Sequence, residues 1–83
     1  MDFITEEKRI FLKDEDGKVI AEIEFAEIEK GKYNIYHTFV DESLRGQGIA
    51  SELVERAVNE IKRRGGSVQA TCSYAKKWLE RRG

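Results

Sequence analysis

An arginine and two glycines precede an amphipathic segment in the run Arg45-Gly46-Gln47-Gly48. Glycine leaves main-chain amides uncovered, and the first amides of a helix have no intrahelical partners, so such a turn can bind an anion. Arg45 adds a forked donor that suits phosphate. The run is not a Walker loop, because no Gly-Lys-Ser/Thr follows, and it lacks the third glycine of the dinucleotide fingerprint. The spacing therefore indicates either a phosphate-binding turn or a tight turn without a ligand.

The single cysteine is a second candidate for chemistry. Cys72 closes the strand that we expect at residues 67–72, next to the start of the segment that we expect to form the last helix. A thiol at a helix N-terminus has a lowered pKa, which raises its thiolate fraction and its reactivity. The alternative is that Cys72 is a small buried apolar residue, as lone cysteines often are.

The single histidine, His37, is the only side chain whose ordinary pKa lies near neutrality, which suits a general base. It shares the alternation of Ile35 and Phe39, so a hydrogen-bonded histidine in the core is the alternative. Glu22 and Glu24 on the neighbouring strand are rival candidates for the base. Such residues also occur simply as the solvated face of a sheet.

Three pieces of the chain together resemble a known family. The segment Arg45-Gly46-Gln47-Gly48-Ile49-Ala50 fits the Q/R-x-x-G-x-G/A signature of the GCN5-related N-acetyltransferases. With His37-Thr38 before it and Cys72-Ser73-Tyr74 near the C-terminus, the chain resembles the small single-domain NATD1-like branch of that superfamily. The resemblance covers roughly residues 10–82.

The resemblance implies a site for acetyl-coenzyme A. In the superfamily the signature turn holds the pyrophosphate through main-chain amides, and the pantetheine arm lies between two splayed parallel strands. The cofactor-binding residues expected on this basis are Phe39, Val40, Arg45, Gly46, Gln47, Gly48, Ile49 and Ala50.

The activity implied is transfer of an acetyl group to an amine, which is a protein lysine or N-terminus, a polyamine or another small amine. Cys72 is then the suspected active residue, as a nucleophile that carries the acetyl group or in an acid–base or steric role. Tyr74 would protonate the departing thiolate of coenzyme A, or else only pack alongside Trp78. His37 would deprotonate the amine. Two other functions stay open: a module that binds or senses acyl-coenzyme A without turnover, and an interaction domain that binds no ligand.

The elements that must position these residues follow from periodicity. We expect an α+β fold of order βββαβα, with helices packed on a mixed four-stranded sheet, and residues 1–6 frayed. This matches the centre of the acetyltransferase fold, without the helices and strand hairpin that usually flank it and build the acceptor site. The elements expected are strands at 7–13, 19–25 and 33–40, a helix at 47–64, a strand at 67–72 and a helix at 74–82.

The alternation of apolar residues predicts which side chains face the core. On the third strand it places Tyr33, Ile35, His37 and Phe39 on one face. The other residues expected to face the core are Ile10 and Leu12 on the first strand, Val19, Ala21, Ile23 and Phe25 on the second, and Ile49, Ala50, Leu53, Val54, Ala57, Val58 and Ile61 on the long helix.

Composition bounds the remaining possibilities. With 83 residues, the chain fits a single domain, 1–83. Lysine plus arginine (15) nearly balance aspartate plus glutamate (16), so no basic excess points to nucleic acid.

No apolar run is long enough to span a membrane, and one cysteine allows no internal disulfide, so we expect a cytoplasmic protein. One histidine and one cysteine on separate strands argue against a metal site. Tyr36 and Trp78 suggest a monomer or a weak homodimer.

Overall fold

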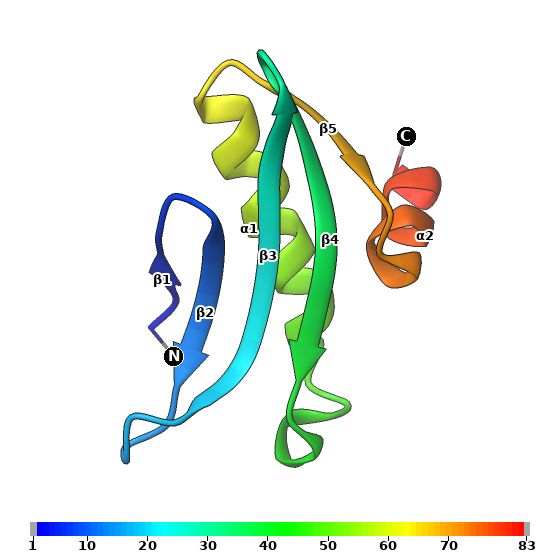
Figure 1. Ribbon diagram of the computed structural model, residues 1–83. Coiled ribbons are helices and arrows are strands. Elements are labelled where there is room, and N and C mark those ends of the chain that lie inside the picture. The colour runs from blue at the N-terminus through cyan, green and yellow to red at the C-terminus, as the bar shows by residue number, and fades with distance from the viewer. Residues whose placement is uncertain (1, 83) are drawn as a thin grey trace.

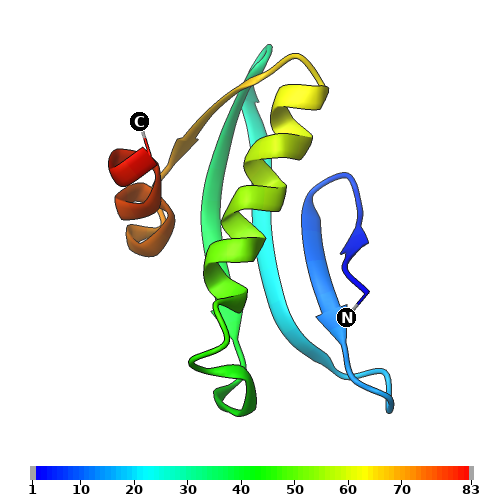
Figure 2. The same cartoon turned by 180° about the vertical axis from the view of Figure 1, so that it is seen from behind.

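Five strands form one mixed sheet, and a long helix covers one of its faces (Figures 1 and 2). The computed structural model describes residues 2–82. In chain order the elements are β1 (Ile4–Thr5), β2 (Arg9–Lys13), β3 (Val19–Glu29), β4 (Lys32–Val40), a short 3-10 helix (Glu42–Leu44), α1 (Ile49–Arg63), β5 (Ser67–Ala70) and α2 (Ser73–Arg82).

The sheet has one strand more than the sequence predicts. Residues 1–6 were expected to be frayed, but Ile4 and Thr5 pair with Phe11 and Ile10 of β2 in an antiparallel ladder. The α+β class is correct, while the four-stranded sheet and the order βββαβα are wrong, because the order is ββββαβα. Two residues are too few to show an alternation, so periodicity alone misses such a strand.

The core lies between α1 and the covered face of the sheet. Leu53, Val54, Ala57 and Ile61 are fully buried along one side of α1, as their spacing predicts. They pack with the buried residues of β2 and β3, among them Ile23. Burying a large aliphatic side chain stabilises the fold by about 1.5–3 kcal/mol, so this layer fixes α1 and the turn that precedes it.

A β-bulge in β4 changes which residues face the core. Phe25 of β3 pairs with Ile35, but the residue before it, Glu24, pairs with His37. Tyr36 is therefore an extra residue in β4. A bulge of this kind reverses the alternation beyond it. The shared face predicted for Ile35, His37 and Phe39 is therefore wrong: Ile35 is buried, while His37 and Phe39 are exposed on the outer face.

The pairing of β4 with β5 is parallel, as the strand–helix–strand passage predicts, and it is short. It ends at the pair Ile35–Ala70. The amides of Thr71 and Cys72 then both donate to the carbonyl oxygen of Ile35, at 3.0 and 3.2 Å, and α2 begins at the next residue. Figure 1 shows β5 beside the beginning of β4 and diverging from it, with α2 following β5. The second half of β4 consequently has one edge without a strand partner.

Candidate active site

The loop between β4 and α1 is ordered by its own polar groups. The carboxylate of Asp41 caps the 3-10 helix by accepting from the amide of Ser43 at 3.0 Å and from its hydroxyl at 2.7 Å. These hydrogen bonds lower the pKa of Asp41, because they favour the charged form. The chain then turns through Gly46 and Gly48, whose φ angles are 83° and 74°. Side-chain-bearing residues adopt such angles at a cost, which explains the two glycines.

The N-terminus of α1 keeps its amides free of side-chain caps. Gly48 is the N-cap residue, and within residues 2–82 no side chain bonds to this end of the helix. The first intrahelical bond runs from the amide of Glu52 to the carbonyl of Gly48 at 3.1 Å. The amides of Ile49, Ala50 and Ser51 therefore have no intrahelical acceptor, and the helix dipole gives this end a partial positive charge.

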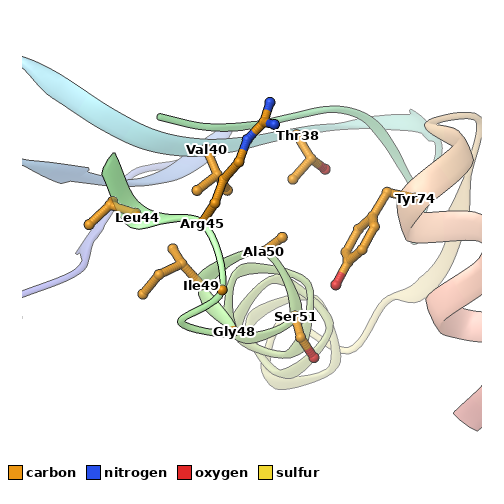
Figure 3. Close-up of a pocket in the computed structure, with 10 residues that line it drawn as sticks. Thr38, Val40, Leu44, Arg45, Gly48, Ile49, Ala50, Ser51 and Tyr74 are labelled. Carbon is orange, nitrogen blue, oxygen red and sulfur yellow. The ribbon is translucent and has the colours of Figure 1, made fainter. Parts of the chain in front are cut away.

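An open cavity of about 360 Å³ lies beside these amides (Figure 3). In that view the Arg45 side chain extends from the turn toward β4, away from the first turn of α1, while Tyr74 projects from α2 toward Ser51. Arg45 forms no ion pair within the described part of the chain. The cavity is lined by Thr38, Val40, Leu44, Arg45, Gly46, Gly48, Ile49, Ala50, Ser51 and Tyr74.

The uncovered edge of β4 adds main-chain groups to the site. The amide of Asp41 donates to the carbonyl of Ile20 on β3 at 2.8 Å. Because neighbouring residues of a strand direct their main-chain groups to opposite edges, those of Val40 and Thr38 point away from β3. The β5 ladder has ended before this point, so these groups border the cavity. Phe39 directs its main chain to β3 and its side chain to the outer face.

Cys72 adjoins the same edge. Its Sγ lies 3.4 Å from the hydroxyl oxygen of Thr38, at the point where β5 gives way to α2. Burial alone would raise the pKa of the Cys72 thiol. The hydrogen bond with Thr38 and the amides of Ala75, Tyr74 and Thr38 outweigh burial, so the pKa is lowered. The sequence predicted this direction from the position before a helix.

A bridge between the two helices holds α2 against α1 near the cavity. The indole Nε1 of Trp78 donates to the hydroxyl of Ser51 at 2.8 Å. The ring is covered on one side by Arg82, whose guanidinium carbon lies 4.8 Å from the ring centroid. Trp78 therefore bonds to α1, and Tyr74, which is 42% exposed, lines the cavity instead. This geometry differs from the alternative in which Tyr74 only packs alongside Trp78.

His37 lies on the opposite side of the sheet from the cavity. It belongs to the exposed outer face, opposite Glu24 in the β3–β4 ladder. Its ring nitrogen and one carboxylate oxygen each of Glu22 and Glu24 all lie within 4.8 Å of one another. The alternative in which His37 is a core residue is excluded by this exposure. The three candidate bases of the sequence thus form one cluster.

The structure brings most of the sequence-predicted site residues together. Tyr74 and six expected cofactor residues line the cavity, and Cys72 borders it through Thr38. Gln47 and Phe39 do not line it. Sequence reasoning gave no role in the site to Thr38, Leu44 and Ser51; Thr38 faces the cavity because of the bulge, which periodicity cannot reveal. The expected cofactor residues that line the cavity are Val40, Arg45, Gly46, Gly48, Ile49 and Ala50.

No helix in residues 2–82 is both long enough and apolar enough to cross a membrane. The search among curated proteins found no match. Solved structures do resemble the chain. A GCN5-like protein from Staphylococcus aureus superposes with a TM-score of 0.79 at 28% identity, over 98% of this chain and 79% of that one.

Two longer acetyltransferases share the fold. One from Bacillus cereus matches with a TM-score of 0.67 at 26% identity, over 78% of this chain and 46% of that one. A GNAT-family N-acetyltransferase from Escherichia coli, solved in complex with CoA, matches with a TM-score of 0.66 at 25% identity, over 75% of this chain and 38% of that one. The chain thus spans less than half of these two proteins. A family model described as GCN5-related N-acetyltransferase matches residues 9–83. The chain therefore belongs to the GCN5-related N-acetyltransferase family, whose members use acetyl-coenzyme A.

Proposed function

We propose that this protein binds acetyl-coenzyme A in the cavity between β4 and α1 and transfers the acetyl group to an amine. The observation that carries the proposal is that one open cavity is bordered by the N-terminus of α1, by Arg45, which has no ion pair within residues 2–82, and by the edge of β4, where Thr38 contacts the Cys72 thiol. The E. coli relative, which was solved in complex with CoA, supports the choice of cofactor.

The residues present fit a diphosphate-bearing ligand. The amides of Ile49, Ala50 and Ser51 lack intrahelical acceptors, and Arg45 supplies a fixed positive charge. A Cβ added at Gly46 or Gly48 would meet nothing within 4 Å, so the backbone there is open to a ligand. Acetyl-coenzyme A supplies an activated acetyl group as its thioester. At the β4 edge, the main-chain groups of Val40 and the carbonyl of Thr38 would hold an extended amide-bearing arm in the manner of an added strand, while the amide of Thr38 interacts with the Cys72 sulfur.

Cys72 is the proposed carrier of the acetyl group. Its thiolate would attack the thioester carbonyl carbon, the bond from that carbon to the sulfur of coenzyme A would break, and the Tyr74 hydroxyl would give its proton to the departing thiolate. A free amine would then attack the acetyl carbon on Cys72. The bond from that carbon to Sγ would break and restore the Cys72 thiolate, and the proton lost by the nitrogen would return to the Tyr74 oxygen. The pKa of Cys72 is lowered, which favours the nucleophilic form. Direct attack by the amine, with Cys72 in an acid–base or a steric role, is the competing route.

His37 is the proposed base that removes a proton from the incoming ammonium, because only the free amine attacks an acyl carbon. Its exposed position implies that the amine approaches from the outer face of the sheet, opposite α1. Acceptors of this chemistry include a protein lysine, a protein N-terminus, a polyamine and other small amines.

We further propose that the protein belongs to the NATD1-like branch of the family, that it is located in the cytoplasm, and that it is a monomer or a weak homodimer.

A second candidate function is binding or sensing of acyl-coenzyme A without turnover. It is favoured by the lining of the cavity, which among the described residues includes the glycine turn and the first residues of α1 but neither Cys72 nor His37. The same cavity would serve both functions. The difference lies in whether Cys72 accepts an acetyl group and whether an amine removes it.

Intact mass spectrometry separates these functions. After incubation with acetyl-coenzyme A, transfer through Cys72 predicts an added acetyl group on the wild-type protein and none on Cys72→Ala. Adding a panel of amines should then discharge the adduct and release free thiol. A Tyr74→Phe variant should retain the adduct but turn over more slowly. Thiol release by Cys72→Ala at the wild-type rate would overturn the covalent route, and the absence of both adduct and thiol release would leave only the binding function.

A further inference from the structure

We propose that Glu22, Glu24 and His37 form a binding site for a divalent transition-metal ion of the Zn²⁺ class on the outer face of the sheet. One ligand atom from each residue lies within 4.8 Å of the other two. The set combines an imidazole nitrogen with two carboxylate oxygens, all of which are established ligands of zinc.

The sheet itself holds the three residues on one face. Glu22 and Glu24 are separated by one residue on β3, so their side chains point to the same side. Glu24 is directly opposite His37 in the ladder, which places their Cβ atoms about 5 Å apart. The extra residue Tyr36 turns His37 outward. A site carried by paired strands needs little ordering when the ion binds.

The spacing of the ligand atoms suits an ion after small rotations of the side chains. Zinc binds nitrogen and oxygen at about 2.0–2.2 Å, so two ligand atoms of a tetrahedral site are about 3.4 Å apart. The 4.8 Å limit in the structure leaves a little over 1 Å to close. Glu22 and Glu24 are half-buried and His37 is exposed, so the outer side of the site stays open to water.

The neighbouring charges leave the site negative. The guanidinium Nη1 of Arg9 lies 2.7 Å from one oxygen of Glu22, and the guanidinium carbon lies 3.9 Å from the centroid of the Phe11 ring. Glu24 forms no ion pair within residues 2–82; its one side-chain contact there is a long hydrogen bond of 3.5 Å from the hydroxyl of Tyr36. Proximity to Glu24 and Glu22 adds to burial in raising the pKa of that tyrosine. The carboxylates of Glu22 and Glu24 therefore carry two negative charges beside the single positive charge of Arg9. Binding of a divalent ion would neutralise the excess negative charge.

One consequence rests on the proposed function. An ion bound to His37 occupies the lone pair that the residue needs as a base, so zinc would slow acetyl transfer to an amine. Acetylation of Cys72 would continue, because Cys72 contacts Thr38 beside the cavity, whereas the ion would be bound on the outer face of the sheet. Binding of the ion requires neither acetyl-coenzyme A nor turnover, so the two proposals can fail separately.

The test is titration of the untagged protein with zinc chloride in the absence of coenzyme A. Binding is measured by calorimetry and by the ring-proton NMR signals of His37. We expect saturable binding and shifts of the His37 ring. His37→Gln and Glu24→Gln should each weaken binding at least about tenfold. Glu55→Gln removes the same charge from an exposed site on α1, and Cys72→Ser removes the only thiol; both should bind zinc as the wild type does.

The proposal is overturned if zinc up to 1 mM, roughly the weak limit of a specific site, leaves the His37 signals unchanged. It is equally overturned if Cys72→Ser abolishes the binding while His37→Gln retains it, which would place the ion at the thiol. Unchanged far-ultraviolet circular dichroism of each variant would show that a loss of binding is not a loss of fold.

Discussion

The hydroxyl of Thr38, at the edge of β4, contacts the sulfur of Cys72. Their Oγ1 and Sγ atoms are 3.4 Å apart. Burial opposes the thiolate at this site, while the Thr38 hydroxyl is the strongest of the contacts that lower the Cys72 pKa. Removing that hydroxyl should let burial dominate, and the thiol should become less acidic.

We therefore expect Thr38→Val to raise the pKa of Cys72 and to slow its alkylation by iodoacetamide near neutral pH severalfold. The measurement is the alkylation rate against pH, whose midpoint should move upward. Thr71→Val is the matched control, because Thr71 is exposed, neighbours Cys72 in the chain and bonds to Asn34 instead. A midpoint that moves equally in both variants would contradict the role given to Thr38.

The lowered pKa of Glu60 should make the free energy of unfolding depend on pH. Hydrogen bonds from Arg63 and then Arg64 lower its pKa from 4.5 to about 2. A carboxyl group with a lowered pKa in the folded state contributes stability above its unfolded pKa and loses it as the pH falls through the folded value. Its contribution is therefore complete above about pH 4.5 and disappears toward pH 2.

Glu60→Gln should lower the free energy of unfolding at pH 7 by about 1 kcal/mol, allowing for solvent screening. Urea unfolding at a series of pH values should show this difference shrinking between pH 4.5 and 2. Glu52→Gln breaks a more exposed helix pair with Arg56 and should cost under about 0.5 kcal/mol. A deficit of Glu60→Gln that stays constant with pH would contradict the assignment.

At the scale of elements, the turn into α1 joins backbone conformation to ligand binding. Gly48 has a φ of 74° at the helix N-cap, and Gly17 has a φ of 84° in the β2–β3 hairpin. A Cβ at either position would meet nothing within 4 Å. Alanine should therefore cost similar strain at both sites, about 1–2 kcal/mol, while only Gly48 adjoins the cavity.

The pair Gly48→Ala and Gly17→Ala consequently separates stability from binding. We expect both variants to lose similar stability in thermal unfolding. Only Gly48→Ala should weaken coenzyme A binding, by about tenfold or more, because the turn relaxes and the helix amides move. Isothermal titration at a temperature where both variants are folded measures this. Equal affinities of the two variants would contradict the importance of the turn.

At the scale of the whole molecule, the sequence predicted the regular parts and missed the irregular ones. The buried stripe of α1 and most inward residues of β2 and β3 follow from periods of 3.6 and 2 residues. Val19 was also expected to face the core, but Ile20 packs there instead, beside the register shift at Lys13. The bulge at Tyr36 does not follow from such a period, because one extra residue leaves no clear signal in the sequence, yet it places each later side chain of β4 on the opposite face. His37 was therefore expected to face inward, whereas it lies on the outer face. Every residue of the glycine signature except Gln47 lines the cavity, whereas Thr38 could be placed only from the structure.

The bulge at Tyr36 places candidate residues on both faces of the sheet. One face is covered by α1 (Figures 1 and 2) and adjoins the cavity; the opposite face carries His37 with Glu22 and Glu24. The two faces meet where β5 and α2 diverge from β4, at Thr38 and Cys72. A donor held on one face and an amine arriving from the other would meet at this edge.

Titration of ¹⁵N-labelled protein with coenzyme A, measured by amide chemical shifts, shows whether the turn before α1 binds coenzyme A. We expect saturable shifts concentrated at residues 45–51 and at the main-chain amides of Thr38 and Val40, with Arg45→Ala weakening the binding. Amides of the β2–β3 hairpin around Gly17 should not move. An absence of shifts at millimolar coenzyme A, or shifts spread evenly over the chain, would contradict it.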